Sequence, residues 1–158
     1  MMKKIILTLL ITGMSLSFAS AQSNYNTGIG FRGGLSSGLT IKHFLDSENA
    51  LEGLASFRWS GYHITGLYER HAPAFDVLGF NWYYGIGGHI GFWDGDENPW
   101  FEDNQSYTVV GIDGIFGLEY TFEEIPINLS IDWKPAYNLV GDTGFWGDDV
   151  ALSIRLVF

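Results

Sequence analysis

The C-terminal segment 150–158 constrains this chain more than any other stretch. Its residues alternate between two faces of an extended strand. One face carries Val150, Leu152, Ile154, Leu156 and Phe158, and the other carries Ala151, Ser153, Arg155 and Val157. The period of two predicts a β-strand with one apolar face. A strand of a soluble protein rarely ends on an exposed aromatic. We therefore expect the strand that ends at Phe158 to belong to a sheet of a different kind from those of soluble proteins.

The N-terminal segment has the pattern of a cleaved signal peptide. Lys3 and Lys4 precede a mostly apolar stretch, 5–18, and Ala19-Ser20-Ala21 forms a small-residue cleavage site. The apolar stretch is shorter than the roughly 20 residues that a membrane-spanning helix needs. We therefore expect residues 1–21 to be removed after export and residues 22–158 to form one domain.

The composition of the mature chain limits its partners. Removing the two lysines of the signal leaves 8 − 2 = 6 basic residues against 18 acidic ones, a net charge of 6 − 18 = −12. This charge argues against nucleic acid as a partner. The chain has no cysteine, so we expect no disulfide and no lipid attached through cysteine. No stretch after residue 18 is apolar enough for a membrane helix, so a membrane location would require strands.

Short alternating runs separated by turn residues fill the mature chain. We predict eight strands, over residues 27–35, 39–45, 51–59, 62–71, 80–93, 109–123, 127–139 and 150–158. Such regular spacing favours a β-barrel or a sandwich. Pro135 lies inside the seventh run and lacks a backbone donor, so we expect a bulge or an early strand end there.

The polar faces of these runs carry a balanced set of charges. If the apolar faces point outward, five basic and five acidic side chains point inward, and Arg70 is the one mature basic residue left over. The inward set is Arg32, Lys42, Glu52, Arg58, Glu69, Asp113, Glu119, Asp132, Lys134 and Arg155. Such a set can pair off inside a narrow eight-stranded barrel and form a closed plug. A soluble lipocalin-like carrier would reverse the faces and line its cavity with Trp82, Tyr84, Ile86, Ile90, Phe92, Phe116, Leu118, Tyr120 and Phe122.

Aromatic residues gather near the predicted strand ends, as in the girdles of transmembrane barrels. They are Trp59, Tyr62, Trp82, Trp93, Tyr120, Phe122, Trp133 and Phe158. Together with the signal peptide, the eight runs and the closing segment 153–158, they make the chain resemble the small OmpA/OmpX-type outer-membrane barrels of Gram-negative bacteria. We therefore expect an all-β protein, an eight-stranded antiparallel transmembrane barrel in the outer membrane.

The resemblance implies several further properties. Phe158 would end the signal that the outer-membrane assembly machinery reads. Both termini would face the periplasm, so the two acidic-aromatic segments, 94–108 and 141–149, would face outside. Outer-membrane lipid and lipopolysaccharide would surround a monomer that needs no cofactor. The first and third connections are shorter than the family usually has, which puts loop functions of the relatives in doubt here.

Acidic residues and histidines are the candidates for a chemical site. Asp94, Asp96 and Glu97 offer clustered oxygen ligands for a divalent cation such as Ca²⁺, although the spacing is not that of an EF-hand. The same segment could instead contact a partner through its aromatics, or be a solvated loop. The four histidines, His43, His63, His71 and His89, lack the spacing of a metal site. Parity places the last three inside, near Glu69, where a His–Glu pair with Thr65 or Ser56 could be imagined as a hydrolytic triad.

We expect no catalytic residues, because inward histidines cannot reach an acyl chain in the membrane. The predicted role is non-enzymatic, in envelope structure or surface interaction. The alternatives are an outer-membrane lipid-modifying enzyme and the soluble periplasmic carrier.

Overall fold

The computed structural model describes residues 25–58, 61–93 and 106–158. These residues form β-strands and turns and contain no helix, so none of them belongs to a helix long and apolar enough to span a membrane. The strands are β1 (Thr27–Gly34), β2 (Ser37–Phe44), β3 (Asn49–Arg58), β4 (Gly61–Pro73), β5 (Phe80–Trp93), β6 (Tyr107–Thr121), β7 (Ile127–Trp133), β8 (Ala136–Val140), β9 (Gly144–Trp146) and β10 (Val150–Val157).

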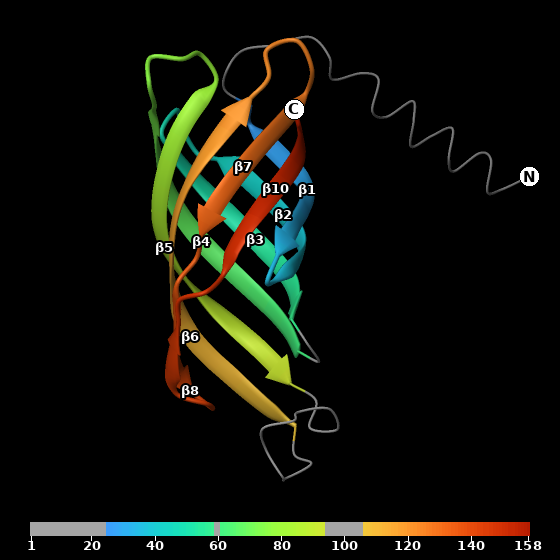
Figure 1. Ribbon diagram of the computed structural model, residues 1–158, viewed down its shortest axis with the longest axis vertical. Helices are drawn as coiled ribbons and strands as arrows, with labels where there is room; N and C mark the ends of the chain where they lie inside the picture. The colour runs from blue at the N-terminus through green and yellow to red at the C-terminus, as the bar shows by residue number, and fades with distance from the viewer. Residues whose placement is uncertain (1–24, 59–60, 94–105) are drawn as a thin grey trace, which may run out of the picture.

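The strands close into an antiparallel barrel with eight positions (Figure 1). Each of β1 to β6 pairs with the next strand along the chain, and β10 returns between β7 and β1. β7 and β8 both pair with β6 and share one position. The predicted eight-stranded closed barrel is thereby confirmed, including the closure between the first and last strands.

The register of the barrel gives its tilt. Moving from Ile90 on β5 to the paired residue on each successive strand leads back to β5 at Phe80, which is 90 − 80 = 10 residues away. A stagger of ten residues over eight strands tilts the strands by roughly 40°. The barrel interior is then narrow enough for side chains to fill it.

The seventh predicted strand is interrupted where Pro135 was expected to disturb it. β7 ends at Trp133 and β8 begins at Ala136. Pro135 has no N–H, but its carbonyl accepts a hydrogen bond from Gly114 N at 2.8 Å. Lys134 N turns away from β6 and donates to Asp149 O at 2.8 Å. The strand therefore breaks and resumes, and segment 141–149, expected to be only a loop, contributes the short strand β9.

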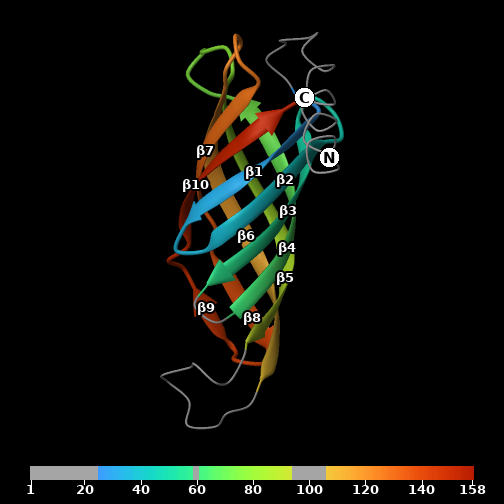
Figure 2. The same cartoon turned by 90° about the vertical axis from the view of Figure 1, so that its right-hand side faces the viewer.

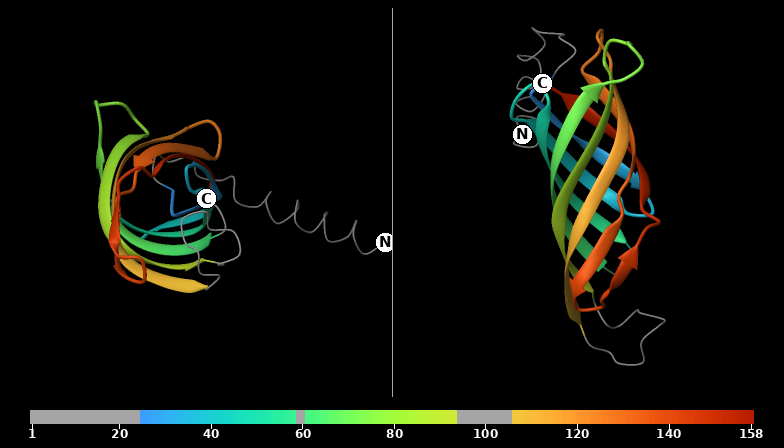
Figure 3. Two further views of the ribbon diagram at one scale, coloured as in Figure 1. Left: turned by 60° about the horizontal axis from the view of Figure 1, so that its bottom comes forward. Right: turned by 90° about the vertical axis from the view of Figure 1, so that its left-hand side faces the viewer.

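The barrel wall is uneven in height (Figure 2). β5 has 14 residues and β1 has 8, which at this tilt correspond to rises of roughly 35 Å and 20 Å. β8, β9 and the far ends of β5 and β6 project beyond the β1–β2 hairpin. The C-terminus lies at the opposite end (Figure 3). We call the two ends the loop side and the termini side.

The distribution of side chains is the reverse of that in a soluble protein. Large apolar residues cover the outside, among them Phe31 (68% exposed), Ile86 (74%) and Leu152 (63%). The interior holds mostly polar and charged side chains, with a small apolar cluster of Leu54, Leu67, Tyr83 and Ile115. Soluble proteins of this size bury their large apolar side chains and seldom bury charge.

Candidate functional site

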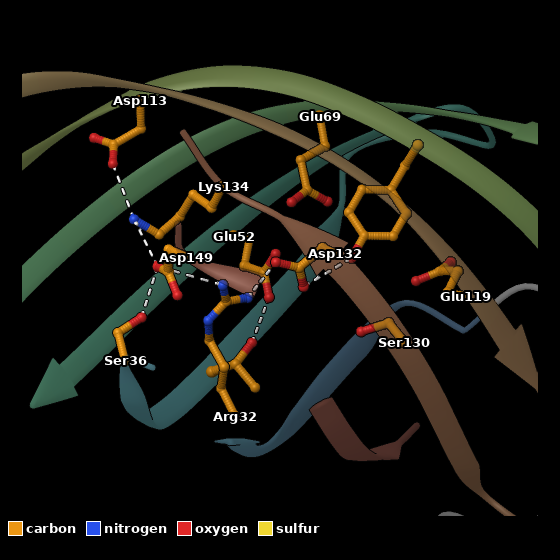
Figure 4. A network of polar contacts seen from close by, with 12 residues as sticks. Arg32, Ser36, Glu52, Glu69, Asp113, Glu119, Ser130, Asp132, Lys134 and Asp149 are labelled. Carbon is orange, nitrogen blue, oxygen red and sulfur yellow. Dashed lines mark hydrogen bonds and ion pairs between the residues drawn. The ribbon is translucent and has the colours of Figure 1, made fainter. Parts of the chain in front are cut away.

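The barrel interior is the most distinctive site of the molecule (Figure 4). Nine of the ten side chains predicted to point inward are buried, and the tenth, Arg58, lies at the loop-side rim with its side chain 11% exposed. The alternation of each strand places these residues inside because the neighbouring apolar residues point outward. The buried charges divide into two clusters along the barrel axis.

The termini-side cluster centres on Lys42, on β2. Its Nζ lies 2.8 Å from Glu69 Oε2 and 3.6 Å from one oxygen each of Glu52 and Glu119. Arg155 forms an ion pair with Glu52 and also donates to Ser130 Oγ at 2.8 Å. Burying such charges is tolerated only when they are paired and hydrogen-bonded, and β2, β3, β4, β6 and β10 each supply one of them.

His71 lies between two carboxylates of the termini-side cluster. Its Nε2 is hydrogen-bonded to Glu69 Oε2 at 3.0 Å, and its Nδ1 lies 3.2 Å from Glu119 Oε1 without a hydrogen bond. In its imidazolium form His71 would give the cluster three cations (Lys42, His71 and Arg155) to set against three carboxylates (Glu52, Glu69 and Glu119).

Two buried tyrosines lie at one end of the interior and between its two charged clusters. Tyr25, which precedes β1, is buried and donates its hydroxyl to Glu119 Oε2 at 3.3 Å on the termini side. Tyr83 lies between the clusters, with Lys42 Nζ 3.9 Å from its ring centroid and its hydroxyl 3.2 Å from Asp132 Oδ2.

The loop-side cluster contains Arg32, Lys134, Asp113, Asp132 and Asp149. Arg32 forms an ion pair with Asp132 and lies 3.6 Å from Asp149. Lys134 Nζ lies 3.1 Å from Asp113 and 3.4 Å from Asp149.

Asp149 was assigned to an outer loop by the sequence analysis, but it is 5% exposed and accepts a hydrogen bond from Ser36 Oγ at 2.6 Å. Strand alternation alone would have placed Asp149 inside, because position 149 shares the inward face with Ala151. The turn residues before β10 led instead to its assignment to a loop.

His89 completes the loop-side cluster. Its Nδ1 lies 2.7 Å from Asp113 Oδ2, and its Nε2 lies 2.9 Å from Asn138 Oδ1. The orientation of Asn138 is fixed because its Nδ2 donates to Asp142 O at 3.0 Å. Both ring nitrogens of His89 are therefore within hydrogen-bonding distance of an oxygen atom.

The interior charges differ from the predicted set of five basic and five acidic residues. Arg58 is not part of the interior, because it pairs with Asp148 at 2.7 Å on the loop-side rim and lies over the ring of Trp146. This hydrogen-bonded guanidinium lowers the pKa of Asp148 below its ordinary value. The interior instead has six carboxylates, four permanent cations and three histidines, His63, His71 and His89.

The interior arrangement offers little for acid–base catalysis. The ring nitrogens of His71 face Glu69 and Glu119, and those of His89 face Asp113 and Asn138, so both rings are directed at carboxylate and amide oxygens rather than at a hydroxyl nucleophile. Thr65 pairs with His89, and Ser56 with His63, as cross-strand neighbours. His71 lies beside Glu69 as predicted, whereas His89 contacts Asp113 and His63 stacks on His89 with 5.8 Å between ring centroids.

The candidate cation ligands Asp94, Asp96 and Glu97 lie outside the described residues, so the structure says nothing of their arrangement. Within the described parts of the chain, no group of three or more histidine or acidic residues has the geometry to hold a metal ion.

Phe158 lies at the seam of the barrel. Its carbonyl accepts hydrogen bonds from Asn26 N at 3.2 Å and Thr27 N at 2.8 Å, and its amide donates to Thr27 O at 2.9 Å. Its side chain is 52% exposed on the outer surface. The last residue thus extends the β1–β10 pairing and presents an aromatic ring at the termini-side rim.

Comparison with protein-family models, with curated proteins and with solved structures finds no match to this chain.

Proposed function

We propose that the chain is an outer-membrane barrel, exported through a cleaved signal peptide, with a plugged interior and a non-enzymatic role in envelope structure or surface interaction. The observation that carries the proposal is the reversed distribution of side chains. Apolar residues surround the outside, and ion pairs fill the inside. Lipid is the solvent in which such an exterior is stable.

The height of the apolar exterior fits a bilayer. Outward apolar residues run from the start of β5 at Phe80 to its far end at Phe92, and similar rows follow β4 and β6. Over 12 residue steps (92 − 80) this is a rise of roughly 30 Å at the tilt of the barrel. The wall is shorter around β1 and β2, so the average height of the apolar exterior is closer to the ~25 Å apolar band of outer-membrane barrels.

The side-chain directions weigh against the soluble carrier. The residues that would line a lipocalin-like cavity lie on the outer face, with Tyr84, Ile86, Phe92 and Phe116 each about half exposed or more. The lumen that would hold the ligand is occupied by charged residues. The lipid-modifying enzyme is the less favoured alternative, since His71 and His89 face carboxylate and amide oxygens inside the barrel rather than a hydroxyl nucleophile at its lipid-facing rim.

The orientation follows the OmpA/OmpX resemblance. Asn26, just before β1, is hydrogen-bonded to Phe158 at one end of the barrel, so the termini side would face the periplasm. The loop side, where β5 ends and β6 begins and where segment 141–149 lies, would face the outside. Surface interaction would fall to these segments, because the other two loop-side connections are short.

Cell fractionation with electrophoresis of boiled and unboiled samples tests the membrane proposal. We expect an outer-membrane band whose mobility changes on boiling, because a closed barrel resists detergent at room temperature. A detergent-free soluble protein with no mobility change would refute it.

Conductance of the protein in planar bilayers tests the plug separately. The paired interior predicts no large channel, and single-channel events above roughly 0.5 nS would contradict a closed lumen.

A further inference from the structure

The outer surface of the barrel carries an open apolar groove that the proposed function does not explain. It crosses β6, β7, β10 and β1, reaches Phe80 on β5, and has a volume of about 610 Å³.

Two rows of paired residues flank the groove. One row is Tyr120, Leu129, Ile154 and Phe31, each opposite the next on a neighbouring strand. The other row is Leu118, Ile131, Leu152 and Gly33. Their side chains point outward and are apolar, so the groove offers a ligand no charged group. Its polar lining residues, such as Arg32 and Ser130, direct their side chains into the barrel.

Gly33 gives the groove its open end. A Cβ at this position would have no heavy atom within 4 Å, whereas the corresponding positions of the row carry large side chains. From Phe80 to Gly33 the groove crosses four strand spacings, a length of about 19 Å. It is therefore long, narrow and apolar, which is the shape of an extended hydrocarbon chain rather than of a compact ligand.

We propose that this groove binds one acyl chain of a phospholipid and holds that lipid at a fixed place on the barrel. The proposal rests on the membrane location argued above, because the groove is continuous with the apolar exterior. Its aromatic end, at Phe80 and Tyr120, lies on the termini side, and Gly33 lies nearer mid-barrel. In the proposed orientation the termini side faces the periplasmic leaflet, so the occupant is a phospholipid and not lipopolysaccharide.

The glycines of the barrel provide a matched test. Gly33→Phe places a ring in the groove without a backbone clash. Gly66→Phe is the control, because Gly66 also points outward, on β4, and a Cβ there likewise has no heavy atom within 4 Å. Gly33→Leu is a smaller substitution that keeps the test valid if the phenylalanine variant folds poorly. The mobility change on boiling verifies that each variant forms the barrel.

The readout is retention of phospholipid. Each protein is reconstituted with palmitoyl-oleoyl-phosphatidylethanolamine, transferred to mild detergent and examined by native mass spectrometry. We expect the wild-type protein and Gly66→Phe to retain one lipid, and Gly33→Phe to lower the lipid-bound fraction about five- to tenfold because the chain loses its apolar contacts. Gly33→Leu is expected to give an intermediate reduction.

Equal lipid retention in all folded variants would overturn the proposal. So would a dimer that Gly33→Phe abolishes, because the groove would then be an interface between two copies of the chain. Either result leaves the membrane proposal standing if the barrels still fractionate with the outer membrane. Soluble behaviour of the wild-type protein would instead refute the membrane proposal itself.

Discussion

Removing the charge of Lys42 tests the energetic role of the interior most sharply. At an effective dielectric constant of about 20, a contact of 2.8 Å contributes about 6 kcal/mol and each contact of 3.6 Å about 5 kcal/mol of gross attraction. The cost of removing the ammonium from water offsets much of this sum. The variant Lys42→Met keeps the length of the side chain but removes the cation that faces three carboxylates. We therefore expect it to lose about 3–5 kcal/mol of the free energy of unfolding.

Arg70 supplies the matched control. Its Nη2 lies 2.7 Å from Glu48 Oε2, about as close as Lys42 Nζ lies to Glu69 Oε2, but the side chains of Arg70 and Glu48 are both more than half exposed. Arg70→Met should cost less than about 1 kcal/mol, because water screens exposed pairs.

The double variant Lys42→Met/Glu69→Gln restores charge balance. It should recover about 2 kcal/mol or more relative to the sum of the single changes.

Urea titration of the refolded barrel in lipid vesicles, followed by tryptophan fluorescence, measures these differences. The reasoning fails if Lys42→Met and Arg70→Met cost the same. It also fails if Glu69→Gln gives no relief in the background of Lys42→Met, because the loss would then come from packing rather than charge.

Three other predictions concern the seam, the loop-side cluster and the rim. Gly30→Ala places a Cβ 1.8 Å from a backbone carbonyl of β10 and should cost about 3 kcal/mol or prevent closure, whereas Gly33→Ala should be neutral; equal refolding yields and mobility changes would contradict this. His89→Gln removes the ring contacts to Asp113 and Asn138 and should cost about 1–3 kcal/mol in the same urea assay, and an unchanged midpoint would contradict this. Arg58 lowers the pKa of Asp148, so their ion pair is present above about pH 4 and is lost as the pH falls through the lowered pKa. Arg58→Gln should therefore speed pepsin cleavage of segment 141–149 at pH 4.5 but not at pH 2. Equal cleavage rates of the variant and the wild-type protein at pH 4.5 would show that the Arg58–Asp148 pair does not hold this segment.

The strands and their faces could be predicted because the barrel obeys a period of two almost without exception. The predicted bounds of Phe80–Trp93 match the observed ones, and the other strand ends differ by at most two residues, apart from the break of the seventh predicted strand at Pro135. Gly38 and Gly61 fall between the predicted strands but lie within β2 and β4, because backbone pairing continues into tight hairpins. Hydrophobic alternation does not detect this continuation, since it depends on the partner strand.

The composition of the ion clusters could be predicted only in part. Parity assigned ten charged residues to the interior, and nine of them are buried, but it could not tell that Arg58 stops at the rim. Nor could it show that Asp149 reaches back toward Lys134, since both outcomes depend on where β3 and β10 end in space. The contacts of His71 and His89 are with three-dimensional neighbours at distances of 2.7–3.2 Å, which no spacing in the sequence encodes.

The central claim is that the apolar exterior faces lipid, and spin labelling tests it most directly. The chain has no cysteine, so single variants such as Ile86→Cys and Phe92→Cys on the outside, and Asp46→Cys in a turn, can be labelled cleanly. In vesicles, the labels at 86 and 92 should collide readily with oxygen and rarely with a water-soluble nickel complex, and the label at 46 should do the opposite. Labels at 86 and 92 that collide mainly with the nickel complex would contradict the account.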